Sequence, residues 1–131
     1  MFKTILILSA IFASLQTFAH GEDVPGPHGG YIQMPANFHT EVVPDKNGKS
    51  FKVYLTDLQF KNPLTKNSEV KAQLGDQNIL CSVKKDYFLC SGAKNLKSGT
   101  LVIKATRDGV VAQTEATYDL PLKSFKQTMH H

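Results

Sequence analysis

Four residues near the start of the chain carry groups that could bind one transition-metal ion: His20, His28, His39 and Glu41. If the chain is cleaved after Ala19, His20 would offer its α-amine and its ring Nδ1 to the ion. A second imidazole from His28 or His39 would complete a set of three nitrogens, and Cu(II) favours tetragonal nitrogen ligands. Glu41 could add an oxygen ligand or orient a histidine that binds the ion. These residue types predict a copper site, and another divalent transition metal would accept the same ligands.

The spacing of the histidines does not by itself identify a metal site. The intervals between His20, His28 and His39 match no zinc signature such as Cys-x2-Cys or His-x3-His, and a histidine among glycines can simply be solvated. His39 and Glu41 stand two residues apart in a predicted strand, which places both side chains on one face about 7 Å apart. That face could hold an ion, or it could be a solvent-facing strand edge.

Other potential ligands lie outside this set. Met34 is close in sequence, and its soft thioether would suit Cu(I). Met129, His130 and His131 end the chain, in a polar segment that we expect to be loose. Ligands in such a tail would bind a metal weakly and without specificity.

Residues 1–19 have the pattern of a cleaved secretory signal peptide. Lys3 precedes an apolar run from Ile5 to Leu15, which is shorter than the roughly 20 residues that a membrane-spanning helix requires. A small-x-Ala site follows and ends at Ala19, as a signal peptidase requires. A buried N-terminal helix is the alternative interpretation. We therefore expect a periplasmic or secreted domain with no transmembrane segment after cleavage.

Composition and motifs argue against several other functions. The formal net charge is only +4 and is spread along the chain, and no aromatic platform lies among basic residues, so we expect no nucleic-acid binding. No Gly-x-Ser-x-Gly nucleophile turn is present, and nothing in the sequence places paired acids in a cleft. A copper oxygenase would need a broader substrate face than one small domain offers. We therefore predict that the protein is not an enzyme.

Short alternating segments between turn signals predict an all-β domain. Apolar and polar residues alternate as in half-buried strands, and Asn47-Gly48 and Asp108-Gly109 are hairpin signals. We expect an antiparallel immunoglobulin-like β-sandwich of seven or eight strands, preceded by a flexible arm rich in Gly and Pro. The expected segments are a signal peptide (1–19), the arm (20–30), the sandwich (31–123) and a loose tail (124–131). The expected strands are 31–34, 38–43, 51–56, 70–74, 79–83, 87–91, 101–106 and 110–120.

The two cysteines predict a disulfide within one hairpin. Val83 and Phe88 flank a tight turn at Lys85-Asp86, and the same register places Cys81 directly opposite Cys90 on one face. Directly opposed residues are within disulfide range. An exported protein is oxidised, so these cysteines form a structural bridge rather than a metal site.

The Asp108-Gly109 turn predicts the register of the last hairpin in the same way. A two-residue turn there sets three cross-strand pairs: Leu101 with Ala116, Ile103 with Thr114, and Ala105 with Ala112.

Two regions of the chain resemble known families. The Gly-Pro-His28-Gly-Gly stretch followed by Phe-His39-x-Glu41 resembles small periplasmic proteins and N-terminal modules found with heavy-metal efflux systems. The stretches 51–57 (Phe-Lys-Val-Tyr-Leu-Thr-Asp) and 96–103 (Leu-Lys-Ser-Gly-Thr-Leu-Val-Ile) resemble the YtkA/FixH-like immunoglobulin-type domains of exported bacterial proteins. The resemblance implies periplasmic metal handling, with copper as the expected ion.

The function expected from these observations is buffering or delivery of copper by a monomeric periplasmic protein. Its partner would be a metal efflux or metal-acceptor protein of the envelope. The alternative is a metal-free interaction module of the envelope, which would dock a partner on a face or an edge of the sandwich.

Overall fold

The computed structural model describes residues 24–35, 37–92, 96–110 and 113–122. These residues form an all-β domain of eight antiparallel strands, as predicted, and they include no helix. No helix within these ranges could therefore cross a membrane. The predicted signal peptide, His20 and the predicted C-terminal tail lie outside the described residues. The strands are β1 (Tyr31–Gln33), β2 (His39–Pro44), β3 (Ser50–Thr56), β4 (Glu69–Leu74), β5 (Gln77–Val83), β6 (Phe88–Ser91), β7 (Gly99–Thr106) and β8 (Thr114–Leu120).

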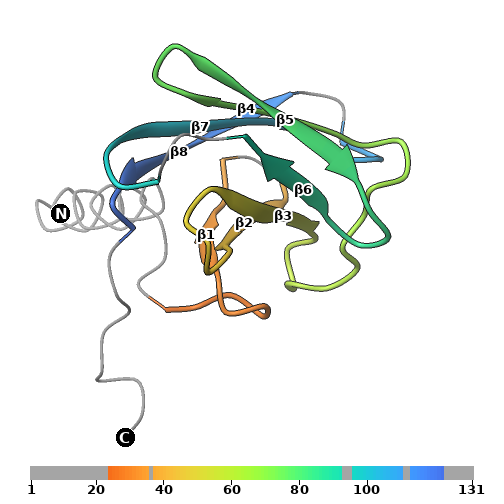
Figure 1. Ribbon diagram of the computed structural model, residues 1–131. Helices are drawn as coiled ribbons and strands as arrows, with labels where there is room; N and C mark the ends of the chain where they lie inside the picture. Colours follow the sequence, from red (N-terminus) through yellow and green to blue (C-terminus); the bar gives the residue numbers. More distant parts are fainter. Residues whose placement is uncertain (1–23, 36, 93–95, 111–112, 123–131) are drawn as a thin grey trace, which may run out of the picture.

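The strands are arranged in two layers that are joined through β5 (Figure 1). One layer contains β1, β2, β3 and β6, and the other contains β4, β7 and β8. Residues 77–79 of β5 pair with β4, whereas residues 80–83 of the same strand pair with β6. β7 returns to lie beside β4, which completes a Greek key of the kind found in immunoglobulin-like sandwiches.

Alternate side chains of the strands build the core between the two layers. In β3, every second side chain from Phe51 to Leu55 is fully buried, and β7 presents Leu101 and Ile103 to the same core in the same way. Each such side chain contributes roughly 1.5–3 kcal/mol when it is removed from water. Phe38, just before β2, is also completely buried and anchors the start of the strand that carries the candidate site.

The cysteine hairpin has the predicted register. Val83 pairs with Phe88 and Cys81 pairs with Cys90, and the Lys84 N–H donates to the Tyr87 carbonyl to close the turn. Cys81 and Cys90 form a disulfide with an S–S distance of 2.04 Å. The predicted bridge is therefore confirmed.

The predicted register of the last hairpin was wrong by two residues. Ile103 pairs with Ala116 rather than with Thr114, and Leu101 pairs with Tyr118. The Val110 N–H does donate to the Arg107 carbonyl, so a turn forms at Asp108-Gly109, but the ladder starts only farther along, at Ala105 and Thr114. Because a shift of two residues preserves the inward face, it brings Tyr118 into the core and keeps Ala116 buried. Ala112, which was predicted to pair with Ala105, lies outside the described residues.

A side chain joins the two strands at the ends of the sheet order. The Thr117 N–H of β8 donates to Gln33 Oε1 of β1 at 2.9 Å, and the Gln33 amide nitrogen donates to the Thr117 carbonyl. The Gln33 amide thus makes both hydrogen bonds that a neighbouring strand would make, and it brings the sheet close to closure.

Candidate functional site

The described part of the arm folds into a tight turn against β2. The Gly29 N–H donates to the Gly26 carbonyl, with Pro27 between them where its fixed φ suits a turn, and the Gly26 N–H donates to the Gly30 carbonyl. A Cβ on Gly30 would lie only 2.5 Å from the carbonyl oxygen of Val42. The close approach of the arm to β2 therefore requires glycine at this position.

The buried carboxylate of Glu41 accepts hydrogen bonds from this turn. The residue is 1% exposed, and its Oε2 accepts the N–H groups of His28 at 2.9 Å and of Gly30 at 2.8 Å. Its Oε1 lies 2.8 Å from Nδ1 of His28. A buried charge is tolerated only when it is well paired, and here donors surround both oxygens. Glu41 is thus the anchor of the arm.

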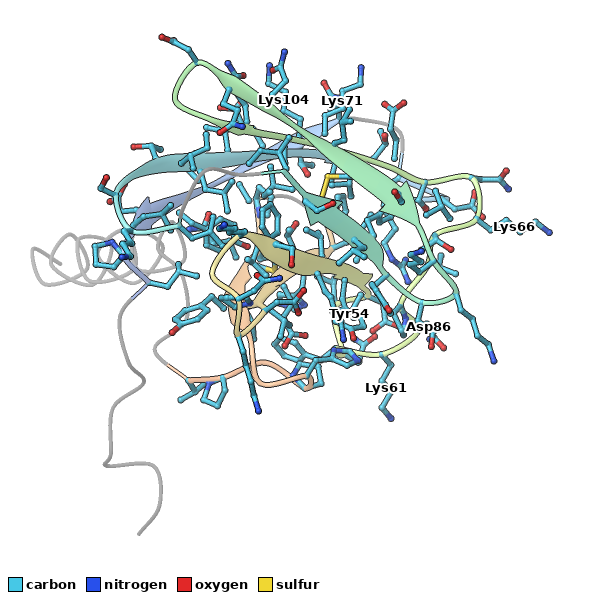
Figure 2. All side chains as sticks on the ribbon, in the orientation of Figure 1. Tyr54, Lys61, Lys66, Lys71, Asp86 and Lys104 are labelled. Atoms are coloured by element: carbon cyan, nitrogen blue, oxygen red, sulfur yellow. A yellow bond between two sulfur atoms is a disulfide. The ribbon has the colours of Figure 1, made fainter. Side chains whose placement is uncertain are left out.

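The His28 imidazole is fixed on two sides. Nδ1 faces Glu41 Oε1, and the ring stacks on Tyr54 with a centroid distance of 3.6 Å and an interplanar angle of 5°. Tyr54 is the register partner of Glu41 and lies on the side of the sheet where the arm passes (Figures 1 and 2). A carboxylate oxygen accepts from Nδ1, so when the imidazole is neutral its hydrogen is on Nδ1 and its lone pair is on Nε2. The His28 side chain remains 31% exposed.

His39 occupies a second pocket on the same face of β2. Its Nδ1 lies 2.9 Å from the Asp57 carbonyl oxygen, and its ring stacks on Phe60 at a centroid distance of 3.9 Å. A carbonyl oxygen only accepts, so when this imidazole is neutral its hydrogen is also on Nδ1 and its lone pair is on Nε2. The solvent-facing alternative for this face was wrong, because His39 is 6% exposed and Glu41 is 1% exposed. The arm and the loop after β3 cover it.

The loop after β3 places Phe60 over His39. Asp57 Oδ1 accepts the N–H groups of Gln59 and Lys61, and Oδ2 accepts the Asn62 amide. These hydrogen bonds stabilise the ionised form and so lower the pKa of the Asp57 carboxyl, and the bond from Lys61 has the largest effect. Phe60 itself adopts a left-handed backbone conformation with φ of 62°. The loop is therefore a defined turn organised by one carboxylate.

Tyr118 supports β2 from its core side. Its hydroxyl donates to the Thr40 carbonyl at 2.9 Å. Thr40 lies between His39 and Glu41, whose side chains point to the opposite face of the sheet. Burial raises the pKa of Tyr118, and the negative charge of Glu41 raises it further. Burial also raises the pKa of Tyr54, with smaller contributions from Tyr87 and Glu41. The strand that carries both pockets is thus held on both faces.

The structure brings some of the predicted site residues together. His28 and Glu41 are in direct contact, whereas His39 has its own partners in the neighbouring pocket. Among the described residues, no group of three His, Cys, Asp or Glu side chains is placed to hold a metal ion. Both Glu41 oxygens are engaged by protein donors, so its contacts fit an orienting role better than that of a ligand. Met34, whose thioether would suit Cu(I), is 39% exposed.

Sequence reasoning missed the residues that fix the two imidazoles. The position of Tyr54 could have been predicted, because alternation in a strand with Val53 and Leu55 in the core places it on the outer face. The positions of Phe60 and of the Asp57 carbonyl could not, because an irregular loop sets them.

No protein-family model, curated protein or solved structure matches this chain. The function must therefore be argued from the geometry of the two imidazoles.

Proposed function

We propose that this chain binds a transition-metal ion, with Cu(II) preferred, and that it buffers or delivers the ion outside the cytoplasm. One observation carries the proposal: Glu41, buried and fully hydrogen-bonded, accepts from Nδ1 of His28 at 2.8 Å. Histidines that bind metals usually donate their other ring N–H to a carboxylate or carbonyl, which fixes the ring and makes the ligating nitrogen more basic. His28 has that arrangement, and its side chain is partly exposed.

The ligand set that we propose centres on Nε2 of His28. His20, four residues before the described part of the arm, would add its ring and, after cleavage at Ala19, its α-amine. His39 has the same tautomer as His28 and would be the further imidazole of the site. Glu41 would position His28 rather than bind the ion, and its charge would offset the positive charge of the bound metal.

The available donors favour copper over softer or harder ions. Imidazole nitrogens suit Cu(II), which ranks highest among the divalent first-row metals in nitrogen sites. Cys81 and Cys90 are joined in a disulfide, so no thiolate from them is available for a soft-metal site. The bound ion would supply a positively charged, exchangeable centre, and the role of the chain would be to hold and release it.

Export to the periplasm or beyond is part of the same proposal. The disulfide is typical of an oxidising compartment, and the N-terminal sequence predicts a signal peptide. The resemblance to modules found with heavy-metal efflux systems supports an envelope efflux or metal-acceptor protein as the recipient.

Cu(II) titration by isothermal calorimetry tests this proposal. We expect His28→Ala to weaken binding by about tenfold or more, and Glu41→Gln to weaken it by roughly 10- to 100-fold, because the loss of an orienting partner has that effect. His39→Ala and His20→Ala should each cause a measurable decrease. His130→Ala serves as the matched control and should leave the affinity unchanged. Unchanged affinity in His28→Ala would exclude the site.

Two further measurements separate the parts of the proposal. Mass spectrometry of the exported protein identifies the first residue, and a start other than His20 would remove the α-amine from the ligand set. Binding should be weaker at pH 6 than at pH 7.5, because each imidazole must lose its proton to bind a metal. If no variant alters copper binding at either pH, the alternative function as a metal-free interaction module becomes the better one.

A further inference from the structure

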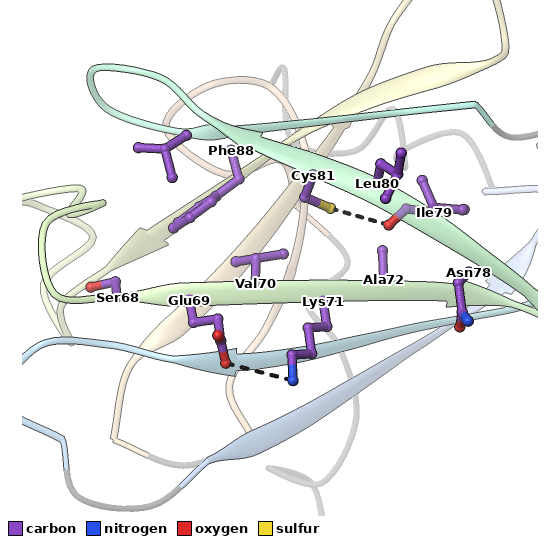
Figure 3. A pocket seen from close by; sticks show the side chains of 11 residues that line it. Ser68, Glu69, Val70, Lys71, Ala72, Asn78, Ile79, Leu80, Cys81 and Phe88 are labelled. Atoms are coloured by element: carbon purple, nitrogen blue, oxygen red, sulfur yellow. Dashed lines mark hydrogen bonds and ion pairs between the residues drawn. The ribbon is translucent and has the colours of Figure 1, made fainter.

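β4 and β5 separate partway along their length and leave a groove between them. Their ladder runs from Leu74 and Gln77 only as far as Ala72 and Ile79. Beyond this point, residues 69–71 of β4 pair with β7 alone, and residues 80–83 of β5 pair with β6 alone. Figure 3 shows the two strands on either side of the opening.

The groove has apolar walls and a volume of about 590 Å³. Val70, Ile79 and Phe88 line it and are buried. Leu80 and Val83 also line it, but their exposed fractions are 81% and 62%. Because both residues line the same groove as the buried apolar side chains, they extend one apolar surface, and a contiguous apolar surface rimmed by polar residues marks an interaction site.

Both sides of the groove also present main-chain groups. Along an antiparallel strand, successive residues direct their N–H and C=O groups to opposite sides. Where β4 and β5 no longer pair, some of these groups in residues 69–71 and 80–83 point into the groove. Such edges bind other extended chains, because only a second strand repeats donors and acceptors at the same spacing. At the opposite seam, between β1 and β8, Gln33 already occupies the N–H and C=O groups of Thr117.

One end of the groove is basic. Lys84 and Lys85 follow Val83 directly, and the Thr65 hydroxyl lies 3.1 Å from both of their carbonyl oxygens. This contact brings the loop that carries Lys66 to the same end. Asp86 is the one acidic residue of that turn, and it lies on the same side of the molecule as Lys66 (Figure 2).

The remaining charges at the groove largely cancel. Glu69 lies 4.0 Å from Lys71, and both residues line the groove. The net positive charge therefore lies at the end where Lys66, Lys84 and Lys85 outnumber Asp86. An acidic group on the ligand would complement this end.

The geometry points to a strand-accepting site between β4 and β5 for an extended segment of another protein, with acidic residues where the segment reaches Lys84 and Lys85. Main-chain hydrogen bonds would align the segment, its side chains would cover Leu80 on one face of the sheet and Val83 on the other, and its acidic end would contact the lysines. A second copy of this chain fits less well, because the chain carries a net positive charge and two copies therefore repel. This site does not depend on the proposed copper site.

Hydrogen exchange with synthetic peptides tests the inference on the full exported protein in buffer with EDTA. The probes are three hexapeptides of alternating Val and Thr. The acidic peptide has two Glu at one end, and the lysine version has two Lys at that end. The third probe is the acidic peptide with N-methyl groups along its backbone. We expect the acidic peptide to slow exchange of amides within residues 69–71 or 80–83. The lysine version should bind about tenfold more weakly, and the N-methylated version should not protect these amides.

Charge reversal at the basic end provides the matched variant. Lys84→Glu combined with Lys85→Glu should weaken binding of the acidic peptide by about tenfold, whereas Lys46→Glu with Lys49→Glu, in the turn between β2 and β3, should leave it unchanged. All four side chains are exposed, so the variants should fold. The inference is overturned if no peptide protects these amides at concentrations up to about 1 mM. It is also overturned if sedimentation shows that a second copy of the chain fills the groove.

Discussion

His28 and His39 lie over the same face of β2, and the Nδ1 of each donates a hydrogen bond to a protein acceptor. The acceptor of His28 is a buried carboxylate, and the ring remains partly open to solvent. The acceptor of His39 is a backbone carbonyl, and Phe60 covers the ring. The same tautomer therefore occurs in two environments. Only the pocket of His28 combines access with a negative charge that can offset a bound cation, which makes His28 the central ligand and His39 the secondary one.

The largest effect should come from removing the carboxylate that distinguishes the two pockets. Glu41→Ala leaves the N–H groups of His28 and Gly30 without their acceptor, and we expect the free energy of unfolding in urea to fall by about 3 kcal/mol. Asp57→Ala, which removes the exposed carboxylate near His39, should cause a much smaller decrease. Equal losses in the two variants would mean that the pockets do not differ in this way.

A smaller effect should come from crowding the arm while the carboxylate stays in place. In Gly30→Ala the new Cβ would meet the Val42 carbonyl oxygen at 2.5 Å, and such overpacking costs about 1–3 kcal/mol. The imidazole ¹⁵N signals of His28 should shift and those of His39 should not.

The neighbouring glycine is the control for that experiment. Gly29 has φ of 79° and open space around its Cα, so Gly29→Ala should cost only the backbone strain, about 1–2 kcal/mol. A His39 signal that shifts as much as that of His28 in Gly30→Ala would show that the two pockets respond as one unit.

The smallest effect should come from the support that both pockets share. Tyr118→Phe removes the hydrogen bond to Thr40, and near neutral pH we expect a loss of about 1 kcal/mol. Because burial raises the folded-state pKa of Tyr118 above the unfolded value near 10, its contribution is fully present below about pH 10 and is lost as the pH rises above that value. The stability difference between wild type and variant should therefore shrink in alkaline urea titrations. A difference that stays constant from pH 8 to 11 would contradict this.

Features set by local turn chemistry could be predicted from the sequence. The pairing of Cys81 with Cys90 follows from a short turn and strand alternation, and it is confirmed. The last hairpin shows the limit of this reasoning. Its turn forms at Asp108-Gly109, but the ladder begins only at Ala105 and Thr114, in a register that places Tyr118 in the core.

The candidate site was only partly predictable for a related reason. Alternation places His39 and Glu41 on one face, as the sequence predicts. The contact between His28 and Glu41 joins residues 13 positions apart, and it depends on the close approach of a glycine-rich turn. The position of Phe60 depends on a left-handed residue in an irregular loop. Neither interaction has a periodicity that a sequence pattern could reveal.

The Gln33 bridge has a consequence for solubility. An open sheet edge exposes main-chain donors and acceptors that can recruit further chains, and repeated edge-to-edge addition is the route to fibrils. At the β1–β8 seam, the N–H and C=O of Thr117 are already occupied by one amide side chain. A single glutamine therefore withdraws the main-chain groups of Thr117 from those that another chain could bind at this seam.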